Sequence, residues 1–591
     1  MRQSSGLVTK YRRWFWFSFL TFRMNDPTWL WRNINWKKVE VKVFKLQKRI
    51  YQASQRGDVK KVSLLQRLLS KSFYAKLFAV RTVSQDNQGK RTAGVDGVKS
   101  LTPPERLTLA GSLQFANQSK PARKVWIPKS DGSKRGLGIP TLYERAKQTV
   151  LKMVLEPEWE AKFEPNSYGF RKGRAGHDAI KAIWNGLRTK GKYVLDADIS
   201  KCFDRIDHDY LLQKLNTSPT FARQIRAWLK AGVVDGGSLF PTKEGTPQGG
   251  VISPLLANIA LHGLETVVRE YVVNQPSQRL GARGKQRKLE TVGFVRYADD
   301  FVLMHWNREI VEECQVIIEE FLSKIGCELK PSKTRLCHTA KTVEDNKVGF
   351  DFLGFTIKQH EVGKHQHGKK KSNLMTIIKP SDEKVKLHYQ KLADTIDRHQ
   401  ASKQIDLIKE LNSIIKGWSN YYSACCSSET FKDLDNKMWS KLRRWAERRH
   451  PNKNWEWVIN KYWRQAVKGR NDKWVFSSTD GLYLVKHSWT PHQNYVKVKG
   501  DASPFNGDWR YWSSRMGSYP DVKVEVAKLL KTQKGKCAIC GLHFQDGDLW
   551  EVDHITPRSK KGRNILSNKQ LLHRHCHDVK SRNDGSYEGC A

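Results

Sequence analysis

Two adjacent aspartates, Asp299 and Asp300, interrupt the apolar run FVRYADDFVLM at 294–304. Successive side chains of a strand point to opposite faces, so one apolar face cannot bury both carboxylates. Upstream, YVLDADI at 193–199 has a similar pattern and presents Asp198 near its end. We therefore expect two strands of one sheet to bring the three aspartates together, with YADD in a tight turn that lets both of its aspartates leave the sheet. The alternative is that they are only turn formers.

Three carboxylates gathered in this way require a cation. Unneutralised carboxylates about 4 Å apart repel by roughly 4 kcal/mol per pair at an effective dielectric constant near 20. Hard divalent cations prefer carboxylate oxygen. Two Mg²⁺ ions held about 3.5–4 Å apart can activate an attacking 3′-hydroxyl and stabilise a leaving pyrophosphate. The pattern therefore favours a two-metal site.

The C-terminal unit, from about residue 531, contains a second group of potential ligands. A C-x2-C pair and an H-x2-C pair have the spacing of a closed tetrahedral Zn²⁺ site, and such a site is structural. Its ligands would be Cys537, Cys540, His573 and Cys576. His543 or His575 could replace His573, and that choice stays open. Outside this set remain Asp553, His554, Asn568 and His577. A zinc ribbon that only binds DNA is the alternative.

The charge of the chain points to a polyanionic partner. Its 591 residues include 105 Lys and Arg against 59 Asp and Glu, a formal net charge of +46. Such a field attracts nucleic acid, and the 21 Trp, 18 Tyr and 23 Phe offer flat surfaces on which unpaired bases can stack. A basic surface that only confers solubility is the alternative. The ten cysteines are mostly scattered, which predicts a reducing compartment, a local metal site and no disulfide framework.

Hydrophobic periodicity indicates the elements that must position these residues. Apolar residues at three- and four-residue spacing over 36–83 predict a pair of basic amphipathic helices. Short apolar runs that alternate with helical stretches up to about residue 360 predict an α+β domain with a central, mostly antiparallel sheet. Three or four helices rich in Trp, Tyr, Lys and Arg are expected over 385–463.

The N-terminal segment YRRWFWFSFLTF at 11–22 follows a basic start and resembles a signal sequence. Its apolar run is too short for a spanning helix, and no small-residue cleavage site follows. We interpret it as a leader of unknown use. Met24 could be the true start, which N-terminal sequencing of the native protein would exclude by finding residues 1–23.

Eight sequence blocks follow one another in the order found in one family. They are AGVDG (93–97), VWIPKSDGSKRGLGIPTLYERAKQ (125–148), SYGFRKGRAGHDAI (167–180), DADISKCFD (196–204), GTPQGGVISPLLANI (245–259), RYADD (296–300), GCELKPSKT (326–334) and FLGF (352–355). In this ordered set the chain resembles the reverse transcriptases encoded by group II introns. The resemblance implies a right-hand polymerase with fingers, a palm built on an antiparallel sheet, and an α-helical thumb.

The resemblance also assigns roles within the blocks. Asp198, Asp299 and Asp300 would bind the two Mg²⁺ ions. Lys129 and Arg135 would hold the triphosphate of the incoming nucleotide, a role that suits cations on a Gly-containing hairpin.

Other positions would contact the sugar, the primer and the template. Gln248 would line the nucleotide site, and Phe203 matches the bulky residue that excludes a ribose 2′-hydroxyl, which favours DNA synthesis. Lys330 stands where the family more often has Asn, and we expect at most a modest change in template contact. The FLGF block would grip the primer end, although it also fits a core strand; its residues are Phe352, Leu353, Gly354 and Phe355.

Downstream, 411–423 and 441–463 resemble the thumb and maturase region, called domain X, of the same family. Basic and aromatic residues on helices suit a structured RNA, which is bound through its shape and backbone. Trp418, Tyr421 and Tyr422 could instead pack a helical bundle. The resemblance implies that the intron RNA performs the splicing chemistry while the protein stabilises its active fold.

The remaining C-terminal residues resemble the HNH nuclease pattern. By that resemblance His554 is the general base that activates water, and Asp553 and His577 hold one divalent ion at the scissile phosphate. Asn568 would fix the His554 loop or approach the metal. The implied fold is a small zinc-containing ββα unit.

We therefore expect an α+β multidomain protein that is a reverse transcriptase, a maturase and a DNA endonuclease. Its expected partners are group II intron RNA, double-stranded target DNA and dNTPs, with no membrane. We expect it in a bacterial cytoplasm or organelle interior, nucleoid-associated as a ribonucleoprotein. The alternatives are a non-catalytic RNA-binding splicing cofactor and a domesticated reverse transcriptase. The expected domains are a leader (1–35), a basic helical extension (36–85), fingers and palm (86–365), thumb and domain X (366–470), a DNA-binding region (471–530) and the HNH endonuclease (531–591).

Overall fold

The computed structural model describes residues 27–584, apart from 129–131, 133, 189, 243, 247, 345, 363–372, 465–471, 473, 521 and 546. The signal-like segment, Met24 and the expected triphosphate ligand Lys129 therefore lie outside the described residues. None of the helices within the described part of the chain is long and apolar enough to cross a membrane.

A helical layer begins the described chain. It consists of α2 (Pro27–Arg32), α3 (Trp36–Gln55), α4 (Val59–Lys71), α5 (Phe73–Arg81) and α6 (Pro103–Ser112). The expectation of two helices over 36–83 was wrong, because α3, α4 and α5 share that stretch. Just after α3, Gly57 has a φ of +70°, and the Asp58 side chain accepts a hydrogen bond from Lys61 N at 3.0 Å. Glycine adopts this conformation without steric cost and Asp caps the next helix, so the chain turns there.

An outer sheet follows, in the strand order β2-β1-β4-β5. Its strands are β1 (Ala122–Pro128), β2 (Lys134–Ile139), β4 (Val233–Asp235) and β5 (Ser238–Phe240). The β1–β2 and β4–β5 pairs are antiparallel, and β1–β4 is parallel. The helices that surround this sheet and the next are α7 (Leu142–Glu160), α9 (Cys202–Arg205), α10 (His208–Leu215), α11 (Pro219–Lys230), α12 (Ser253–Leu261), α13 (Leu264–Asn274), α14 (Ser277–Leu280) and α15 (Lys285–Thr291).

The central sheet has the order β6-β7-β3-β8 and is antiparallel throughout, as the sequence predicted. Its strands are β3 (Tyr193–Asp198), β6 (Gly293–Tyr297), β7 (Asp300–His305) and β8 (Arg335–His338). One face packs on α16 (Arg308–Lys324), where Leu195 and Phe301 join the largest apolar core. The other face, with Val194 and Val302, belongs to a second core that includes residues of α8 (Gly176–Gly186).

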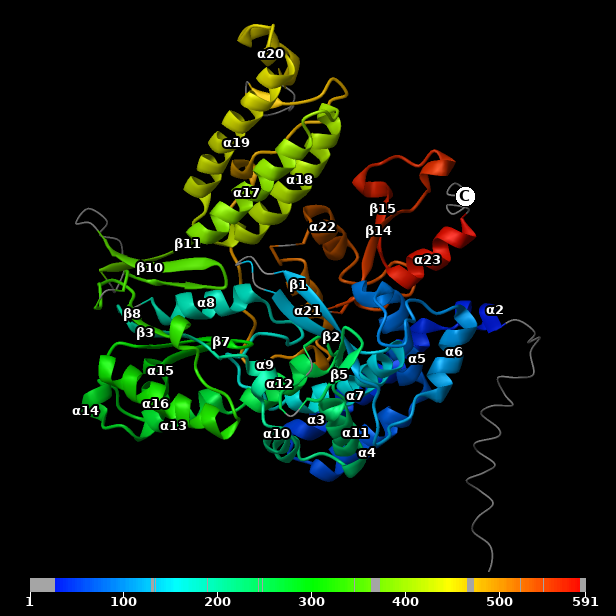
Figure 1. Cartoon of the computed structure of the whole chain (residues 1–591), viewed down its shortest axis with the longest axis vertical. Helices are drawn as coiled ribbons and strands as arrows, with labels where there is room; N and C mark the ends of the chain where they lie inside the picture. The colour runs from blue at the N-terminus through cyan, green and yellow to red at the C-terminus, as the bar shows by residue number, and fades with distance from the viewer. Residues whose placement is uncertain are drawn as a thin grey trace, which may run out of the picture.

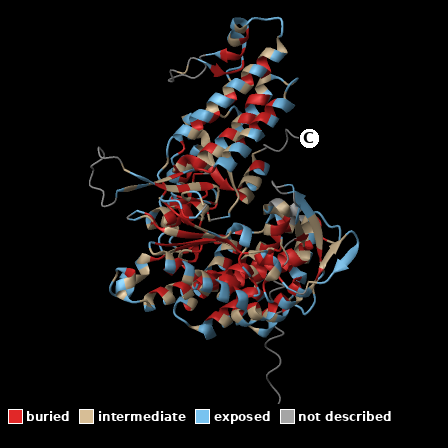
Figure 2. Cartoon of the chain, turned by 60° about the vertical axis from the view of Figure 1, so that its left-hand side comes forward, coloured by how far each residue is buried: buried red, intermediate tan, exposed pale blue. Residues whose placement is uncertain are grey.

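A helical bundle rises from a third, smaller sheet. The sheet has the order β11-β10-β9, with β9 (Phe350–Phe352), β10 (Phe355–Glu361) and β11 (Leu374–Pro380). The bundle contains α17 (Asp382–Arg398), α18 (Gln404–Tyr421), α19 (Ser428–Arg449) and α20 (Trp455–Tyr462), followed by the short pair β12 (Trp463–Arg464) and β13 (Val475–Phe476). Figure 1 shows this bundle projecting from the rest of the molecule, and Figure 2 shows buried residues along its interior and in the central sheet.

The C-terminal unit is a small ββα arrangement. Helices α21 (Trp509–Met516) and α22 (Val524–Thr532) lead into an antiparallel hairpin of β14 (Trp550–His554) and β15 (Lys569–His573), and α23 (Arg574–Asn583) follows. The unit lies against the N-terminal helical layer: His575 Nε2 is 3.8 Å from Glu40 Oε1 of α3, and the ring of Trp509 on α21 is 4.5 Å from that of Phe44.

Candidate active sites

The central sheet brings the three predicted aspartates to one end of β3 and β7. Asp198 pairs directly with Asp300 across these antiparallel strands, and Ile199 N donates to Asp299 O at 3.2 Å. Tyr297 of β6 also pairs with Asp300, so the tight turn consists of Ala298 and Asp299 alone. The expectation that both aspartates leave the sheet was therefore half wrong: Asp299 lies in the turn, whereas Asp300 begins β7.

Burial raises the pKa of two of these carboxylates, Asp299 and Asp300. It raises the pKa of Asp300 to about 7, and the neighbouring Asp299 and Asp198 add to the shift. A buried group of acids that resists losing its protons favours the binding of a cation, because the cation removes the penalty on the charged form. A donor set made only of carboxylates fits a hard ion such as Mg²⁺.

Lys333 is a neighbour of this site that sequence reasoning missed. Its Nζ lies 2.7 Å from Asp198 Oδ2, and this hydrogen bond raises the pKa of the ammonium group. Lys333 belongs to the GCELKPSKT block, and Lys330 N of the same block donates to Asp198 O at 2.8 Å. The available signal was the block itself, since its second lysine had no assigned role.

The SYGF block packs against the turn formed by Ala298 and Asp299. Tyr168 N donates to Arg296 O at 2.9 Å, and Asn258 Nδ2 donates to Gly169 O at 2.9 Å. A Cβ added to Gly169 would lie 2.3 Å from Ala298 N, so this close approach requires glycine. The position of Asp299 therefore depends on a segment more than a hundred residues earlier in the chain.

Two of the predicted nucleotide ligands contact each other directly. Arg135 Nε donates to Gln248 Oε1 at 2.7 Å, and Gln248 Nε2 lies 3.2 Å from Asp204 Oδ1. The outer sheet and the PQGG turn are joined by Gly138 N, which donates to Gln248 O at 2.6 Å. Gln248 and Asp204 line an open pocket of about 450 Å³. Sequence reasoning did not single out Asp204, although it closes the DADISKCFD block.

The predicted steric residue, Phe203, lies one position after Cys202 at the start of α9. Its side chain is largely buried and meets the ring of Phe170 edge to face, with ring centroids 6.0 Å apart. Phe170 is half exposed and has a φ of +59°, which is uncommon for a residue with a bulky side chain. The aromatic pair therefore links the SYGF block to the strand end that carries Asp198.

The FLGF block forms the turn between β9 and β10. Phe352 and Phe355 pair across the hairpin and are 3% and 1% exposed, so the interpretation of these two as core residues fits the structure. Leu353 and Gly354 form the turn itself, with φ values of +50° and +82°. Gly354 O accepts hydrogen bonds from Ser381 N at 2.9 Å and Tyr422 OH at 3.2 Å, which ties the turn to the bundle.

Two of the three aromatic residues considered for RNA binding, Trp418 and Tyr422, pack inside the protein. The Trp418 ring stacks on His388 with centroids 4.3 Å apart, and Tyr422 is buried against Phe355. His388 Nε2 lies 2.9 Å from His487 Nε2, and His487 Nδ1 lies 2.8 Å from Asp435 Oδ1. These contacts favour the packing alternative for Trp418 and Tyr422, because their rings are used inside the protein.

The C-terminal unit brings four potential zinc ligands together. The donor atoms of Cys537, Cys540, His573 and Cys576 all lie within 4.8 Å of one another. This set, the one such cluster found among the described residues, includes His573 rather than His543 or His575. His543 lies against Trp509, and His575 stacks on His573 with centroids 5.3 Å apart. Three thiols and an imidazole fit a structural Zn²⁺ ion.

The four remaining C-terminal residues lie on the hairpin, its loop and α23. Asp553 Oδ1 is 3.8 Å from His577 Nε2, and His554 Nε2 is 3.2 Å from Asn564 Oδ1. Asn568 accepts a hydrogen bond from Thr556 N at 3.0 Å and donates to the Thr556 and Arg563 carbonyls at 3.1 and 2.9 Å, so it fixes the loop after His554.

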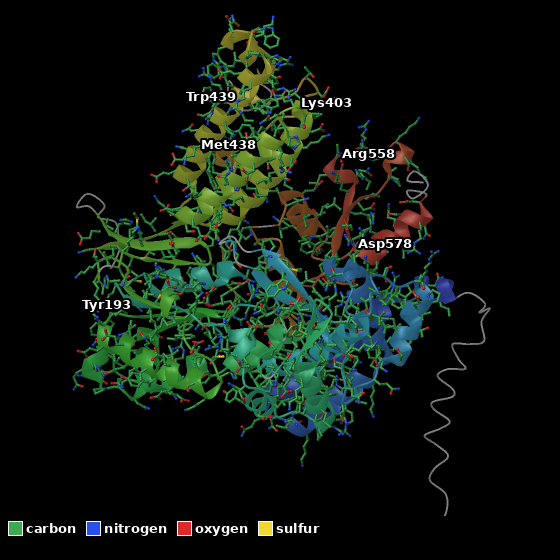
Figure 3. All side chains as sticks on the ribbon, in the orientation of Figure 1. Tyr193, Lys403, Met438, Trp439, Arg558 and Asp578 are labelled. Carbon is green, nitrogen blue, oxygen red and sulfur yellow. The ribbon has the colours of Figure 1, made fainter. Side chains whose placement is uncertain are left out.

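Lys580 is a further residue at this site that sequence reasoning missed. Its Nζ lies 3.0 Å from Asp553 Oδ2 and donates to the His554 carbonyl at 2.9 Å. It lies one helical turn after His577, on the same face of α23, and that spacing was the available signal. In Figure 3, Tyr193 at the start of β3 and Asp578 on α23 lie on opposite sides of the molecule, so the two sites belong to separate parts of the chain.

Four regions of the chain match known protein families. They are the N-terminal domain of reverse transcriptase (31–113), reverse transcriptase, an RNA-dependent DNA polymerase (127–357), the group II intron maturase-specific domain (385–463) and HNH endonuclease (537–583).

Relatives with similar sequences support these family matches. The chain is 34% identical to "Protein YkfC" of Escherichia coli (strain K12) over 309 residues, which is 46% of this chain and 78% of that protein. It is 28% identical to "Group II intron-encoded protein LtrA" of Lactococcus lactis subsp. cremoris over 411 residues, 57% of this chain and 66% of LtrA. The chain belongs to the group II intron-encoded proteins. It is also 27% identical to "Maturase-like protein 1" of Euglena gracilis over 402 residues, 66% of this chain and 77% of that protein.

This intron-encoded protein therefore combines a reverse transcriptase, a maturase domain and an HNH endonuclease, as the sequence predicted. Its sheets are antiparallel apart from the β1–β4 pair, and its α/β content is mixed. The segment between residues 463 and 537 is matched by none of the four family models.

That unmatched segment is integrated into the reverse transcriptase. Asp178 at the start of α8 is completely buried, and its Oδ1 accepts hydrogen bonds from Arg515 Nη2 at 2.5 Å and Val498 N at 2.7 Å. Its Oδ2 accepts from Ala175 N at 2.9 Å, which caps α8. Trp512 lies so close to Gly173 that an added Cβ would be 2.3 Å from its ring.

We call residues 495–519 the brace. The brace contacts one end of the block at 167–180, and the other end of that block packs against the turn of Ala298 and Asp299. The DNA-binding region expected over 471–530 is thus in direct contact with the polymerase. Sequence reasoning could not find this contact, because Asp178 and Arg515 are 337 residues apart.

Proposed function

We propose that the central sheet is the palm of the polymerase, the outer sheet its fingers and the α17–α20 bundle its thumb. The observation that carries this proposal is the pairing of Asp198 with Asp300 across β3 and β7, with Asp299 in the adjoining turn. Two Mg²⁺ ions held by these carboxylates would activate the primer 3′-hydroxyl and neutralise charge on the departing pyrophosphate.

The residues around the palm carboxylates bind the incoming nucleotide in this proposal. Arg135, together with Lys129, holds the triphosphate, because cations on a hairpin suit phosphate oxygens. Gln248 bridges Arg135 to Asp204 and lines the sugar side of the site. Phe203 excludes a ribose 2′-hydroxyl, so dNTPs are the substrates. Leu353 and Gly354 contact the primer end, and the buried Phe352 and Phe355 hold that turn in place.

The C-terminal unit nicks DNA in this proposal. His554 takes a proton from the attacking water, which suits an imidazole whose ordinary pKa is near neutrality. Asp553 and His577 would hold one divalent ion at the scissile phosphate, and Asn568 fixes the loop that follows His554. A Zn²⁺ ion on Cys537, Cys540, His573 and Cys576 would join the loop before the hairpin to α23 and so fix the unit.

The activities form one sequence of events. The protein binds its group II intron RNA, mainly through the basic thumb and maturase domain, and stabilises the RNA fold that splices. The ribonucleoprotein then recognises double-stranded DNA, the RNA inserts into one strand, and the HNH unit nicks the other. The new 3′-hydroxyl primes DNA synthesis on the RNA. Joining nuclease and polymerase in one chain raises their effective concentration. We place this work in the cytoplasm or an organelle interior, at the nucleoid.

Two single substitutions test the proposal. Asp299→Asn should abolish cDNA synthesis on a preformed primer and template while intron RNA binding, splicing and DNA nicking continue. His554→Ala should abolish the nick while primer extension continues. If Asp299→Asn also lost splicing, the separation of the two sites would be wrong. Absence of primer extension by the wild-type protein would instead support a non-catalytic splicing cofactor.

A further inference from the structure

The brace contains a pocket that no matched family region covers. The pocket has a volume of about 490 Å³, within the range of about 300–1,000 Å³ that is usual for small-ligand sites. It opens between the irregular stretch 495–499 and helix α21, and three tyrosines line it: Tyr495, Tyr511 and Tyr519. Aromatic walls of this kind suit the flat face of a nucleobase.

The floor of the pocket is a buried guanidinium. Arg515 is 7% exposed and is held by the Asp178 carboxylate, by Val496 O at 2.7 Å and by Tyr495 OH at 2.9 Å. Its Nε is buried and has no hydrogen-bond partner in the described part of the chain. An unsatisfied buried donor costs free energy, and a small outward shift of Arg515 would offer it to an acceptor in the pocket.

The rim of the pocket is positively charged. Lys499 and Arg510 supply the charge, and Asp508 is the one acidic residue of the lining, whereas the Lys497 ammonium group donates to Tyr168 OH at 3.3 Å. The Asp508 side chain caps α21 through Tyr511 N at 3.1 Å. Lys499 Nζ lies 5.3 Å from the centre of the Tyr511 ring, and neither Lys499 nor Arg510 has a salt bridge to a described carboxylate. In such a pocket, the aromatic ring of a ligand can stack on the tyrosines while its phosphate group binds the basic residues at the rim.

We propose that this pocket takes one unpaired nucleotide of the target DNA, an inference that rests on the proposed nuclease and polymerase functions. A paired base is stacked inside the duplex and cannot enter, whereas an unpaired base can leave the helix. DNA is favoured over RNA by position: α21 packs against α22, which packs on β15 of the nuclease unit, while Arg515 contacts the polymerase through Asp178. A strand that one part nicks and the other extends would pass between these two parts.

The test measures the binding of the full chain to three labelled probes by fluorescence anisotropy. One is a paired DNA duplex, one is the same duplex with a short single-stranded gap, and one has RNA in the strand that spans the gap. Stacking of one base contributes about 1–3 kcal/mol, so we expect the gapped DNA to bind about tenfold tighter than the paired duplex. A 2-aminopurine moved through the gap should change its fluorescence at one position.

Tyr511→Leu and Arg510→Gln should each reduce the preference for the gapped DNA by about five- to tenfold. Arg510 is exposed, so its replacement tests the pocket even if Tyr511→Leu disturbs α21. Tyr389→Leu is the matched control, because the Tyr389 ring is also near a lysine, Lys437 at 5.8 Å, but lies on the bundle. This control should keep the wild-type preference.

Any of three results would overturn the inference. The first is an equal affinity of the wild-type protein for gapped and paired DNA, and the second is a preference that both pocket variants retain. The third is tighter binding of the RNA-containing probe that is lost in the variants, which would assign the pocket to RNA. Nicking and primer extension are measured on the same preparation: if they are present while the preference is absent, the pocket proposal alone fails, and if they are absent the proposed function fails.

Discussion

The polymerase and nuclease sites use similar side chains on very different supports. Asp198 ends one strand and Asp300 begins the next in a four-stranded sheet that is covered on both faces by apolar cores. Asp553 and His554 end a strand of a two-stranded hairpin, whose residues share a much smaller core with α22 and the cysteines. A two-stranded hairpin is marginally stable in water, whereas a larger packed sheet holds its own geometry. The aspartates of the central sheet are therefore held in place by hydrophobic packing. The C-terminal hairpin needs the additional bonds of its proposed zinc site.

Removal of zinc is expected to have the largest effect, and it should affect the nuclease but not the polymerase. Cys537→Ser should lower the zinc content of the protein, unfold the C-terminal unit and abolish nicking, because a structural zinc site contributes about 10–16 kcal/mol to the folding of a small domain. Primer extension should stay within about threefold of wild type, since the central sheet has its own apolar cores. Metal analysis and both assays check this.

Cys314→Ser is the matched control, because Cys314 is buried on α16 away from the cluster. Its zinc content and nicking should equal those of the wild type. Full nicking by the zinc-free protein would show that packing alone holds the hairpin, and the contrast between the sites would disappear.

A smaller effect is expected from a substitution at the contact between the brace and the reverse transcriptase. Asp178→Asn leaves the buried Arg515 without its counter-charge, and breaking a buried pair costs about 3–5 kcal/mol. The block at 167–180 then loses its support, so primer extension should fall about 10- to 100-fold while the zinc content is unchanged. Glu312→Gln, which breaks an exposed pair with Arg308, should change neither by more than about twofold.

The brace can also be tested by truncation. A chain that ends at residue 536 lacks the nuclease unit but keeps Arg515, and it should extend primers. A chain that ends at residue 490 lacks the brace and should not. Equal primer extension by the two chains would mean that the polymerase is independent of everything after the bundle.

The smallest effects concern the lysines beside the two sites. Lys580 is mostly buried and bonds to Asp553, Asp584 and the His554 carbonyl, so Lys580→Met should lower the melting temperature of the nuclease unit. Lys333 is more than half exposed, so Lys333→Met should leave the stability of the reverse transcriptase region within about 1 kcal/mol of wild type.

The catalytic readout for Lys333→Met is the Mg²⁺ concentration needed for half-maximal primer extension. An ammonium group and a divalent cation compete for the same carboxylate, so the variant should need less Mg²⁺, by about fivefold at most. A higher requirement would mean that Lys333 assists metal or nucleotide binding.

The parts of the fold that could be predicted from sequence are those with local patterns. The antiparallel central sheet and the bundle helices follow from periodicity, and the spacing of Cys537, Cys540 and Cys576 anticipates their cluster. The count of N-terminal helices was wrong because the chain breaks twice, at Gly57 between α3 and α4 and again at the extended Ser72 between α4 and α5. Whether Asp300 lies in the turn or the strand depends on the register with β3, which no local signal specifies.

The contacts that could not be predicted are those between distant segments. Nothing in the sequence around Asp178 or Arg515 indicates that they meet, because any buried carboxylate and any arginine satisfy the same chemistry. Trp418 and Tyr422 likewise read as RNA ligands or as core until their neighbours, His388 and Phe355, are known. Side chains of mixed character are assigned by their surroundings, and those are set by the tertiary fold.

The contact between Asp178 and the brace cannot form until both segments have been synthesised. Asp178 emerges from the ribosome 337 residues before its partner Arg515. A contact of such long sequence separation forms late in folding. The turn of Ala298 and Asp299 in a nascent chain therefore lacks its full support until the brace has been translated, so a half-made protein is a poor polymerase on the very RNA that encodes it.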